Sequence, residues 1–199
     1  MKKSLIVAGI LLAGSTLVAN DGYYVGFDIG KSKGYINYGI NFPDYPQYNE
    51  NGSSHGDGSN TQTIKLGKYI DSNNRAGMYY MNVDTDGESA KSYGLTYDYL
   101  IGENQLKPFL GAIVGYVSYE TNELEIINLP DVKIDGMLYG VQAGLNYEAN
   151  KNISFEAGYR YLKSNADYKG NSSMYGIDYS VNADIDKVTG WYIGLNYKF

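Results

Sequence analysis

Cysteine is absent from this sequence of 199 residues, and histidine occurs once, at position 55. Without a thiol the chain can form no disulfide framework and no thiolate metal site, and it cannot be acylated as a lipoprotein. Beyond the first twenty residues it also lacks the run of roughly 20 apolar residues that a membrane-spanning helix needs. These absences favour a protein that relies on β-strand pairing for its stability.

The first 19 residues have the three-part pattern of a secretory signal peptide. Lys2 and Lys3 form its charged region, residues 5–12 are apolar, and small residues lead to Ala19, after which we expect cleavage. A retained membrane helix is the alternative, although the apolar stretch is short for a span. The mature chain, residues 20–199, is long enough for one domain. With 14 basic against 22 acidic residues, it carries a net charge of −8, which argues against nucleic acid as a partner.

Tyrosine and glycine are abundant. The chain has 23 tyrosines against 5 phenylalanines and 1 tryptophan, together with 25 glycines. Tyrosine collects where apolar and wet regions meet, and so suits the aromatic girdles of a membrane β-barrel. A soluble β-sandwich is the alternative, and the mean hydropathy of −0.37 does not separate the two, because only alternate residues of a membrane strand face lipid.

The last twelve residues, 188–199, alternate with a period of two. One face is apolar and aromatic, comprising Trp191, Ile193, Leu195, Tyr197 and Phe199, while the other face comprises Tyr192, Gly194, Asn196 and Lys198. This pattern is typical of a strand with lipid on one side and a polar interior on the other. An unpaired strand so apolar would invite aggregation, whereas closing a barrel removes the edge.

Seven earlier segments are predicted as strands by alternation and turn signals, namely 22–31, 61–70, 75–83, 90–100, 107–119, 137–147 and 153–162. The facing of 75–83 stays open because residues 78–81 are all apolar or aromatic, and that of 107–119 depends on its glycines facing the lumen. Tight turns at 71–74, 102–105 and 148–152 alternate with longer loops at 33–60, 84–88, 120–135 and 164–186. The sequence thus predicts an all-β protein, an eight-stranded antiparallel up-and-down transmembrane β-barrel.

The asymmetry of the connections predicts an orientation. Outer-membrane barrels have short periplasmic turns and long extracellular loops, so we expect both termini in the periplasm. Tags near Gly56, Asn128 and Ser172 should be reachable on intact cells, and tags at Asn73 or Asn150 should not.

Three segments resemble the small outer-membrane barrel family of OmpA-like transmembrane domains and opacity-type surface proteins. They are residues 153–162 (ISFEAGYRYL), residues 107–116 (KPFLGAIVGY) and the C-terminal residues 190–199. The last segment resembles the signal read by the barrel-assembly machinery, with Gly194, Tyr197 and Phe199 at the matching positions. The resemblance implies a Gram-negative outer membrane, with its lipid and lipopolysaccharide as partners, but no single activity. In contrast to OmpA itself, we expect no C-terminal peptidoglycan-binding domain.

Four charged residues fall on the inward face near mid-height: Asp28, Lys65, Glu156 and Arg160. Glu156 and Arg160 lie about 13 Å apart along one strand, so each needs a partner on another strand. Because two are acidic and two basic, we expect an ion-pair network that fills the lumen and blocks conduction. A narrow channel is the alternative, since eight strands leave an interior just wide enough for side chains.

The long loops hold weaker candidates. His55 lies among Ser53, Ser54 and Asp57, which would suit a lipid A-modifying enzyme, but the surrounding glycines favour a solvated loop over a rigid catalytic site. Residues 84–88 (DTDGE) begin like a calcium loop but lack its downstream glutamate. The aromatic residues of the first loop form a contact surface, pack together or extend the outer aromatic girdle: Tyr35, Tyr38, Phe42, Tyr45 and Tyr48. We therefore expect a structural or adhesive surface protein with neither catalysis nor a cofactor.

Overall fold

The computed structural model describes residues 22–55, 58–85, 88–121, 132–174 and 177–199. The predicted signal peptide and its cleavage site lie outside these residues, as do the tag positions Gly56 and Asn128. The elements are β1 (Tyr23–Asn41), the 3-10 helix η1 (Pro46–Tyr48), β2 (Glu50–His55), β3 (Ser59–Tyr69), β4 (Asn74–Thr85), β5 (Glu88–Leu100), β6 (Leu106–Thr121), β7 (Val132–Glu148), β8 (Ile153–Ser164), β9 (Asp167–Met174) and β10 (Ile177–Lys198). No helix in the described part of the chain is long and apolar enough to span a membrane.

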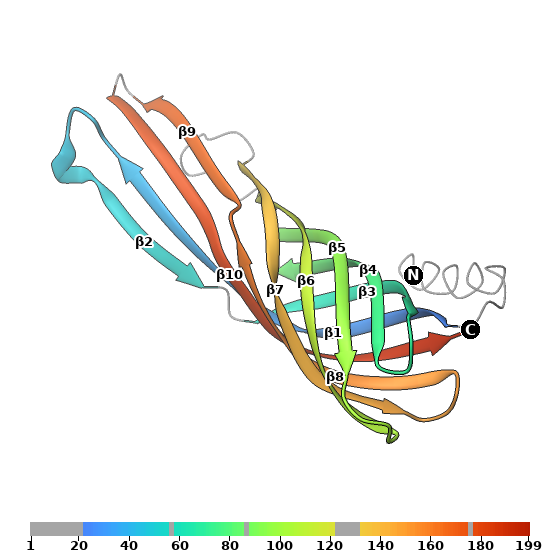
Figure 1. Cartoon of the computed structure of the whole chain (residues 1–199). Helices are drawn as coiled ribbons and strands as arrows, with labels where there is room; N and C mark the ends of the chain where they lie inside the picture. Colours follow the sequence, from blue (N-terminus) through green and yellow to red (C-terminus); the bar gives the residue numbers. More distant parts are fainter. Residues whose placement is uncertain (1–21, 56–57, 86–87, 122–131, 175–176) are drawn as a thin grey trace.

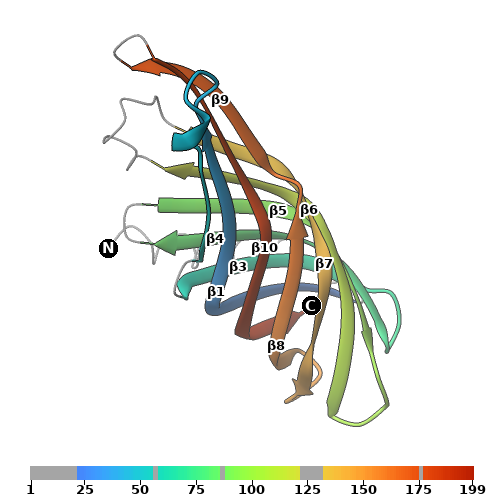
Figure 2. The ribbon, with the colours of Figure 1, turned by 90° about the vertical axis from the view of Figure 1, so that its left-hand side faces the viewer.

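Eight of these strands form a closed ring. They follow the order β1-β3-β4-β5-β6-β7-β8-β10, all antiparallel, and β10 pairs back onto β1 from Tyr24 opposite Lys198 onward (Figures 1 and 2). The Phe199 amide donates to the Tyr23 carbonyl at 2.9 Å and continues this closing seam. The predicted eight-stranded antiparallel barrel is therefore confirmed, with the last strand joined to the first.

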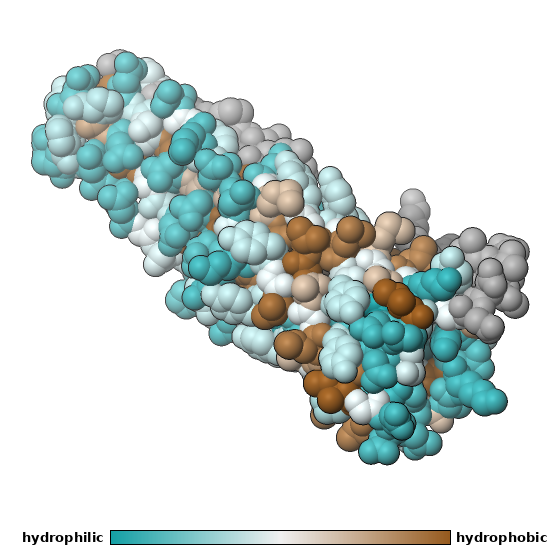
Figure 3. Space-filling view, in the orientation of Figure 1, coloured by the Kyte–Doolittle hydropathy of each residue, from teal (hydrophilic) through white to brown (hydrophobic). Residues whose placement is uncertain are grey.

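Successive side chains of each ring strand point alternately into the lumen and out from the wall. On β5, Tyr93, Leu95, Tyr97 and Tyr99 all point outward, and Figure 3 shows apolar residues gathered over the ring. The two undecided strands are also resolved. On β4, Tyr79 and Met81 are buried in the lumen while Met78 and Tyr80 face outward, and on β6 Leu110 and Val114 face outward as predicted.

The two longest predicted loops are wrong as loops, because both form β-hairpins. Strand β1 continues to Asn41 instead of ending near residue 31, and it pairs with β2 within the predicted loop 33–60. Within the predicted loop 164–186, β9 pairs with the first part of β10. Residues 36–41, β2, β9 and residues 177–185 form a four-stranded extension in the order β2-β1-β10-β9, here named the protruding sheet (Figure 1).

The lumen contains two apolar clusters. The rim cluster lies towards the protruding sheet and includes Tyr79, Met81, Ile113, Val117, Ile134, Leu138, Leu162, Ala166 and Ile185. The second cluster joins Leu100, Phe109 and Tyr192, with Tyr69 packed against it near the tight turns. The ring strands also bury many polar and charged side chains in the lumen.

Candidate functional site

The structure brings the four predicted lumen residues together. Lys65 on β3 forms ion pairs with Asp28 on β1, at 2.7 Å, and with the carboxylate of Glu156 on β8. Arg160, also on β8, donates from Nη2 to Asp28 Oδ2 at 2.5 Å. All four are at most 8% exposed. Glu156 and Arg160 thus take their partners from β1 and β3, as the distance along one strand requires.

Two further charges complete the network. Arg75 donates from Nε to Asp98 Oδ2 and from Nη2 to Glu156 Oε2, both at 2.9 Å. Arg75 and Asp98 are also direct register partners on β4 and β5. Sequence analysis missed both, although Asp98 lies between the outward-facing Tyr97 and Tyr99 and alternation alone would have placed it inward. Arg75 could not be placed because the facing of its strand was undecided.

Neutral side chains connect and satisfy these charges. Gln142 donates from Nε2 to Asp98 Oδ1 at 2.6 Å and accepts from Arg160 Nε at 3.1 Å. Asn196 donates from Nδ2 to Glu156 Oε2 at 2.9 Å. The network therefore extends across the lumen with three acidic and three basic members, so that its formal charge is balanced in a region where an unpaired charge would be costly.

Apolar and aromatic groups close the network on both sides. The Arg160 guanidinium lies 3.8 Å from the centroid of the Tyr192 ring, which belongs to the cluster near the turns. Towards the rim cluster, the void between the network and Leu162 measures about 10 Å³, room for one water at most. The lumen at this height is filled by side chains.

Glycines allow the charged side chains to cross so narrow a ring. A Cβ added at Gly194 would meet the Asp28 carboxylate and would lie 3.1 Å from Glu156 Cγ. Gly194, one of the three residues of the predicted assembly signal, thus leaves the space that the network occupies. Tyr197 and Phe199, the other two, pack edge to face at 5.1 Å at the end of the ring.

The loop candidates are placed as follows. His55 is the last residue of β2 and stacks on Tyr35 at 6.1 Å, while Asp57 lies outside the described residues. The calcium hypothesis for 84–88 stays a hypothesis, because residues 86 and 87 also lie outside. Within the described ranges, no three His, Asp or Glu side chains are grouped so as to hold a metal.

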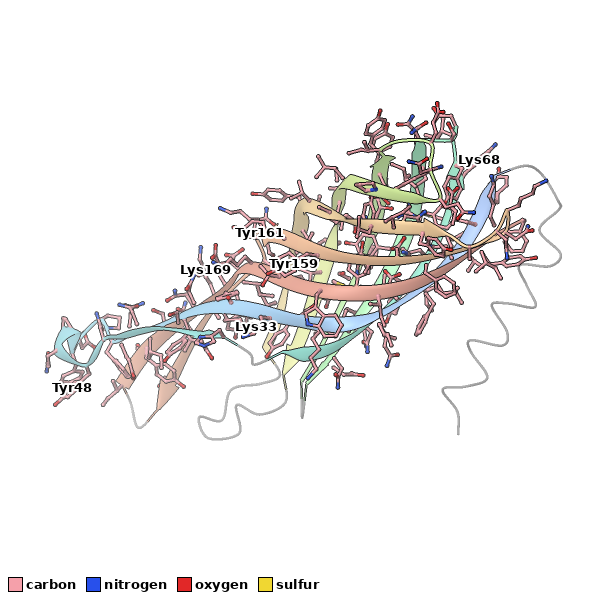
Figure 4. The ribbon with its side chains drawn as sticks, turned by 90° about the horizontal axis from the view of Figure 1, so that it is seen from below. Lys33, Tyr48, Lys68, Tyr159, Tyr161 and Lys169 are labelled. Atoms are coloured by element: carbon pink, nitrogen blue, oxygen red, sulfur yellow. The ribbon has the colours of Figure 1, made fainter. Side chains whose placement is uncertain are left out.

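Some of the first-loop aromatic residues pack on other rings, and their role as a contact surface stays a hypothesis. Tyr45 packs against Tyr48 at 6.4 Å, and Phe42 packs against Tyr179 of β10 at 5.8 Å. Tyr48 nevertheless stays 66% exposed, and Figure 4 shows it at the far tip of the protruding sheet.

No protein-family model and no curated protein sequence matches the chain. Among solved structures, the chain is similar to Neisserial surface protein A, NspA, with 19% identity, a TM-score of 0.57, and coverage of 89% of this chain and 97% of the other. The outer membrane protein OprG of Pseudomonas aeruginosa has 13% identity, a TM-score of 0.58 and coverage of 90% and 96%. The outer membrane protein OprH of P. aeruginosa has 26% identity, a TM-score of 0.52 and coverage of 89% and 99%. These neighbours support an outer-membrane location. The chain therefore has the fold of the small outer-membrane β-barrel proteins, the family that its sequence resembles.

Proposed function

We propose that this protein is an outer-membrane anchor that presents the protruding sheet outside the cell as a contact surface, in a structural or adhesive role without catalysis. The observation that carries the proposal is the continuity of β1 and β10 beyond the ring. Their register runs without a break from Ile36 opposite Ile185 to Asn41 opposite Ser180, and β2 and β9 flank them on either side. A filled barrel thus holds an ordered sheet rather than separate loops.

The tight turns define the orientation we propose. The turns after β3, β5 and β7 lie at the same end of the ring as the C-terminus, and the protruding sheet leaves from the opposite end (Figure 1). Outer-membrane barrels have their short turns in the periplasm. The termini would then be periplasmic and the protruding sheet extracellular.

The surface chemistry of the protruding sheet suits contact with another molecule. Figure 3 shows this region as predominantly hydrophilic, in contrast to the ring. Its tip exposes Tyr45 and Tyr48 beside the polar strand β2. Tyrosine supplies large contact area at low entropic cost, and a sheet that is already paired loses little freedom on binding.

A narrow channel and a lipid A-modifying enzyme are the two rival functions. The charged network and the void of about 10 Å³ beside it argue for a closed lumen, which opposes the channel. The aromatic stacking of His55 on Tyr35 gives that histidine a packing role, which opposes the enzyme. Both rivals are testable, the first by recording conductance in planar bilayers and the second by mass analysis of lipid A after His55→Ala.

The contact role can be tested by shortening the tip alone. Replacing residues 41–49 with Asn-Gly would join Ile40 to Glu50, which already pair, through a two-residue hairpin turn. Bacteria producing the wild type should bind an array of immobilised glycans and matrix proteins, and bacteria producing equal amounts of the folded variant should lose that binding. Equal binding by both strains would refute the role of the tip.

The orientation has its own test. A tag at Ser172, on β9, should be labelled on intact cells, whereas tags at Asn73 and Asn150 should require permeabilised cells. Labelling of either turn on intact cells would contradict the proposed orientation and place the tight turns outside the cell.

A further inference from the structure

Four lysines occupy the outer wall of three adjacent strands where the ring meets the protruding sheet. Lys31 and Lys33 lie on β1, Lys187 on β10 and Lys163 on β8. Each has the parity of the lipid-facing residues on its strand, since Lys31 is opposite Trp191 and Lys187 is opposite Lys163 in the register. We name these four residues the lysine patch.

The lysine patch occupies three successive register rows, each of which also contains an aromatic residue. On β10, Trp191 lies opposite Lys31 of β1 on one side and opposite Tyr159 of β8 on the other. Thr189 lies in the same way between Lys33 and Tyr161. Trp191, Tyr159 and Tyr161 are all exposed on the wall, and Figure 4 shows Lys33 near both tyrosines where the strands leave the ring. Tryptophan and tyrosine mark the headgroup level of a membrane. The lysine ammonium groups can therefore reach that level along the wall.

The opposite wall carries no comparable charge at the corresponding level. There the register beyond the outward-facing tyrosines of β4, β5 and β6 runs through Gln62, Asn82, Lys91 and Ser118. That row carries one lysine and three neutral residues, and the next row outward includes Asp84. The three rows of the lysine patch on β8, β10 and β1 carry four lysines. A general need for solubility would not select one side of the ring.

The lysine patch is electrostatically unfavourable on its own. Lys187 and Lys163 are direct cross-strand partners, and like charges in that position repel. The ion pairs found among the described residues include none of the four, and Lys187 Nζ instead lies 4.4 Å from the centroid of the Tyr35 ring. An anion at this level would relieve the repulsion.

The nearest acidic residues lie further out and are largely occupied. Asp184 accepts a hydrogen bond from Asn37 at 3.0 Å, and Asp167 pairs with Lys169 at 3.5 Å. Asp186 occupies the register shift between β1 and β10 and is exposed. The four lysines thus share their register rows with aromatic residues of the wall, and these carboxylates lie further from the ring.

We propose that the lysine patch binds the phosphate groups of a lipid headgroup, with the lipid's acyl chains against the apolar wall below Trp191. In the orientation proposed above, on which this site rests, the ligand is a phosphorylated glycolipid of the outer leaflet. Lysine attracts phosphate as a point charge, and basic residues at a membrane surface select anionic lipids. The bound lipid would fix the height of the barrel at the base of the protruding sheet.

Trp191 makes the test specific, because it is the only tryptophan of the chain and the register partner of Lys31. Purified, folded protein in zwitterionic micelles is titrated with bis-phosphorylated lipid A while Trp191 fluorescence is recorded, and native mass spectrometry gives the stoichiometry. We expect saturable binding that weakens by at least about tenfold in the variant K31Q/K33Q/K163Q/K187Q. The matched control K68Q/K91Q/K151Q/K198Q removes four lysines elsewhere and should bind like the wild type.

Three results would overturn the proposal: equal weakening in the matched control, equal affinity for dephosphorylated lipid A, or the same fluorescence change with inorganic phosphate. The last would assign the site to a free anion. If the fourfold variant fails to fold, the single variant Lys163→Gln replaces it in the assay. It removes the repulsion with Lys187, so it should fold, and it removes one cation of the site, so it should still weaken binding. The assay needs neither adhesion nor intact cells, so its failure is separable from failure of the proposed contact role.

Discussion

The ring and the protruding sheet share two strands but differ in what surrounds them. In the ring, β1 and β10 have lipid-facing residues such as Ile29 and Ile193 on one side and buried Asp28 on the other. Beyond Ile36 the same two strands continue as part of a sheet with exposed polar residues such as Asn37. Alternation of apolar and polar residues is therefore a property of the membrane environment and not of the strands themselves.

The ion pairs of the two regions differ in the same way. In the ring, the six charged residues of the lumen network are buried, and each of its carboxylates has at least two polar partners. In the protruding sheet, Lys169 and Asp167 form a pair in which the lysine side chain is 79% exposed. Burial makes the loss of one partner costly in the first case, and solvent screening makes it cheap in the second.

The largest effect is expected from Arg160→Ala. The substitution removes a cation that bonds Asp28 and Gln142 and covers the Tyr192 ring. We expect a loss of about 3–5 kcal/mol in the free energy of unfolding, measured in urea by Trp191 fluorescence in lipid vesicles. The matched variant Lys169→Ala, from the exposed pair, should change it by less than about 0.5 kcal/mol.

The same pair of variants tests the closed lumen. Wild-type protein should give no steady conductance in planar bilayers, because the network fills the ring. Steady conductance by the wild type, or identical unfolding of both variants, would refute the network as a plug and favour the channel.

The apolar rim cluster should respond nearly as strongly. Leu138 is fully buried there, so Leu138→Ala should cost about 2–4 kcal/mol through lost burial and the cavity left behind. Tyr48→Ala, in η1 at the tip of the protruding sheet, removes a larger side chain that is 66% exposed and should cost less than about 0.5 kcal/mol. Equal losses would show that the protruding sheet carries as much of the stability as the ring.

Two glycines, one in contact with the lumen network and one with open space around it, allow a comparison in which we expect a smaller effect on stability. Gly194→Val would push a side chain against Asp28 and Glu156, whereas a Cβ at Gly34 meets nothing within 4 Å. We expect Gly194→Val to cost about 1–3 kcal/mol and to lower the yield of folded barrel, as deletion of Phe199 also should. Gly34→Val should leave both unchanged. If Gly194→Val and the Phe199 deletion both gave as much folded barrel as the wild type, the C-terminal assembly signal would be refuted.

The features that the membrane environment imposes on the chain could be predicted from the sequence, and the features of the protruding sheet could not. The eight ring strands, the tight turns and four of the six charged residues of the lumen network follow from alternation with lipid on one side. Strands β2 and β9 were missed because a segment such as Glu50–His55 has no apolar face to reveal its period. Asp98 was missed although its strand alternates clearly, since the outward-facing Tyr97 and Tyr99 place it on the inward face.

The smallest effect is expected at Asp71, in the turn between β3 and β4. Its carboxylate accepts hydrogen bonds from the backbone amides of Asn73 and Asn74, at 2.8 and 2.7 Å, and from the Asn74 side chain. The Asn73 amide first, and then the Asn74 side chain, hold the pKa of Asp71 below its ordinary value of 3.8. A lowered pKa means that the folded turn favours the ionised form, so its contribution to stability is present above that ordinary value and is lost as the pH falls through the folded pKa. Because the group is fully exposed, this should appear as a local change and not as unfolding of the barrel. The carbon-13 signal of the Asp71 carboxyl in micelles should titrate at lower pH than in a peptide of residues 69–76. A midpoint equal to or above that of the peptide would show that the turn does not hold the charge.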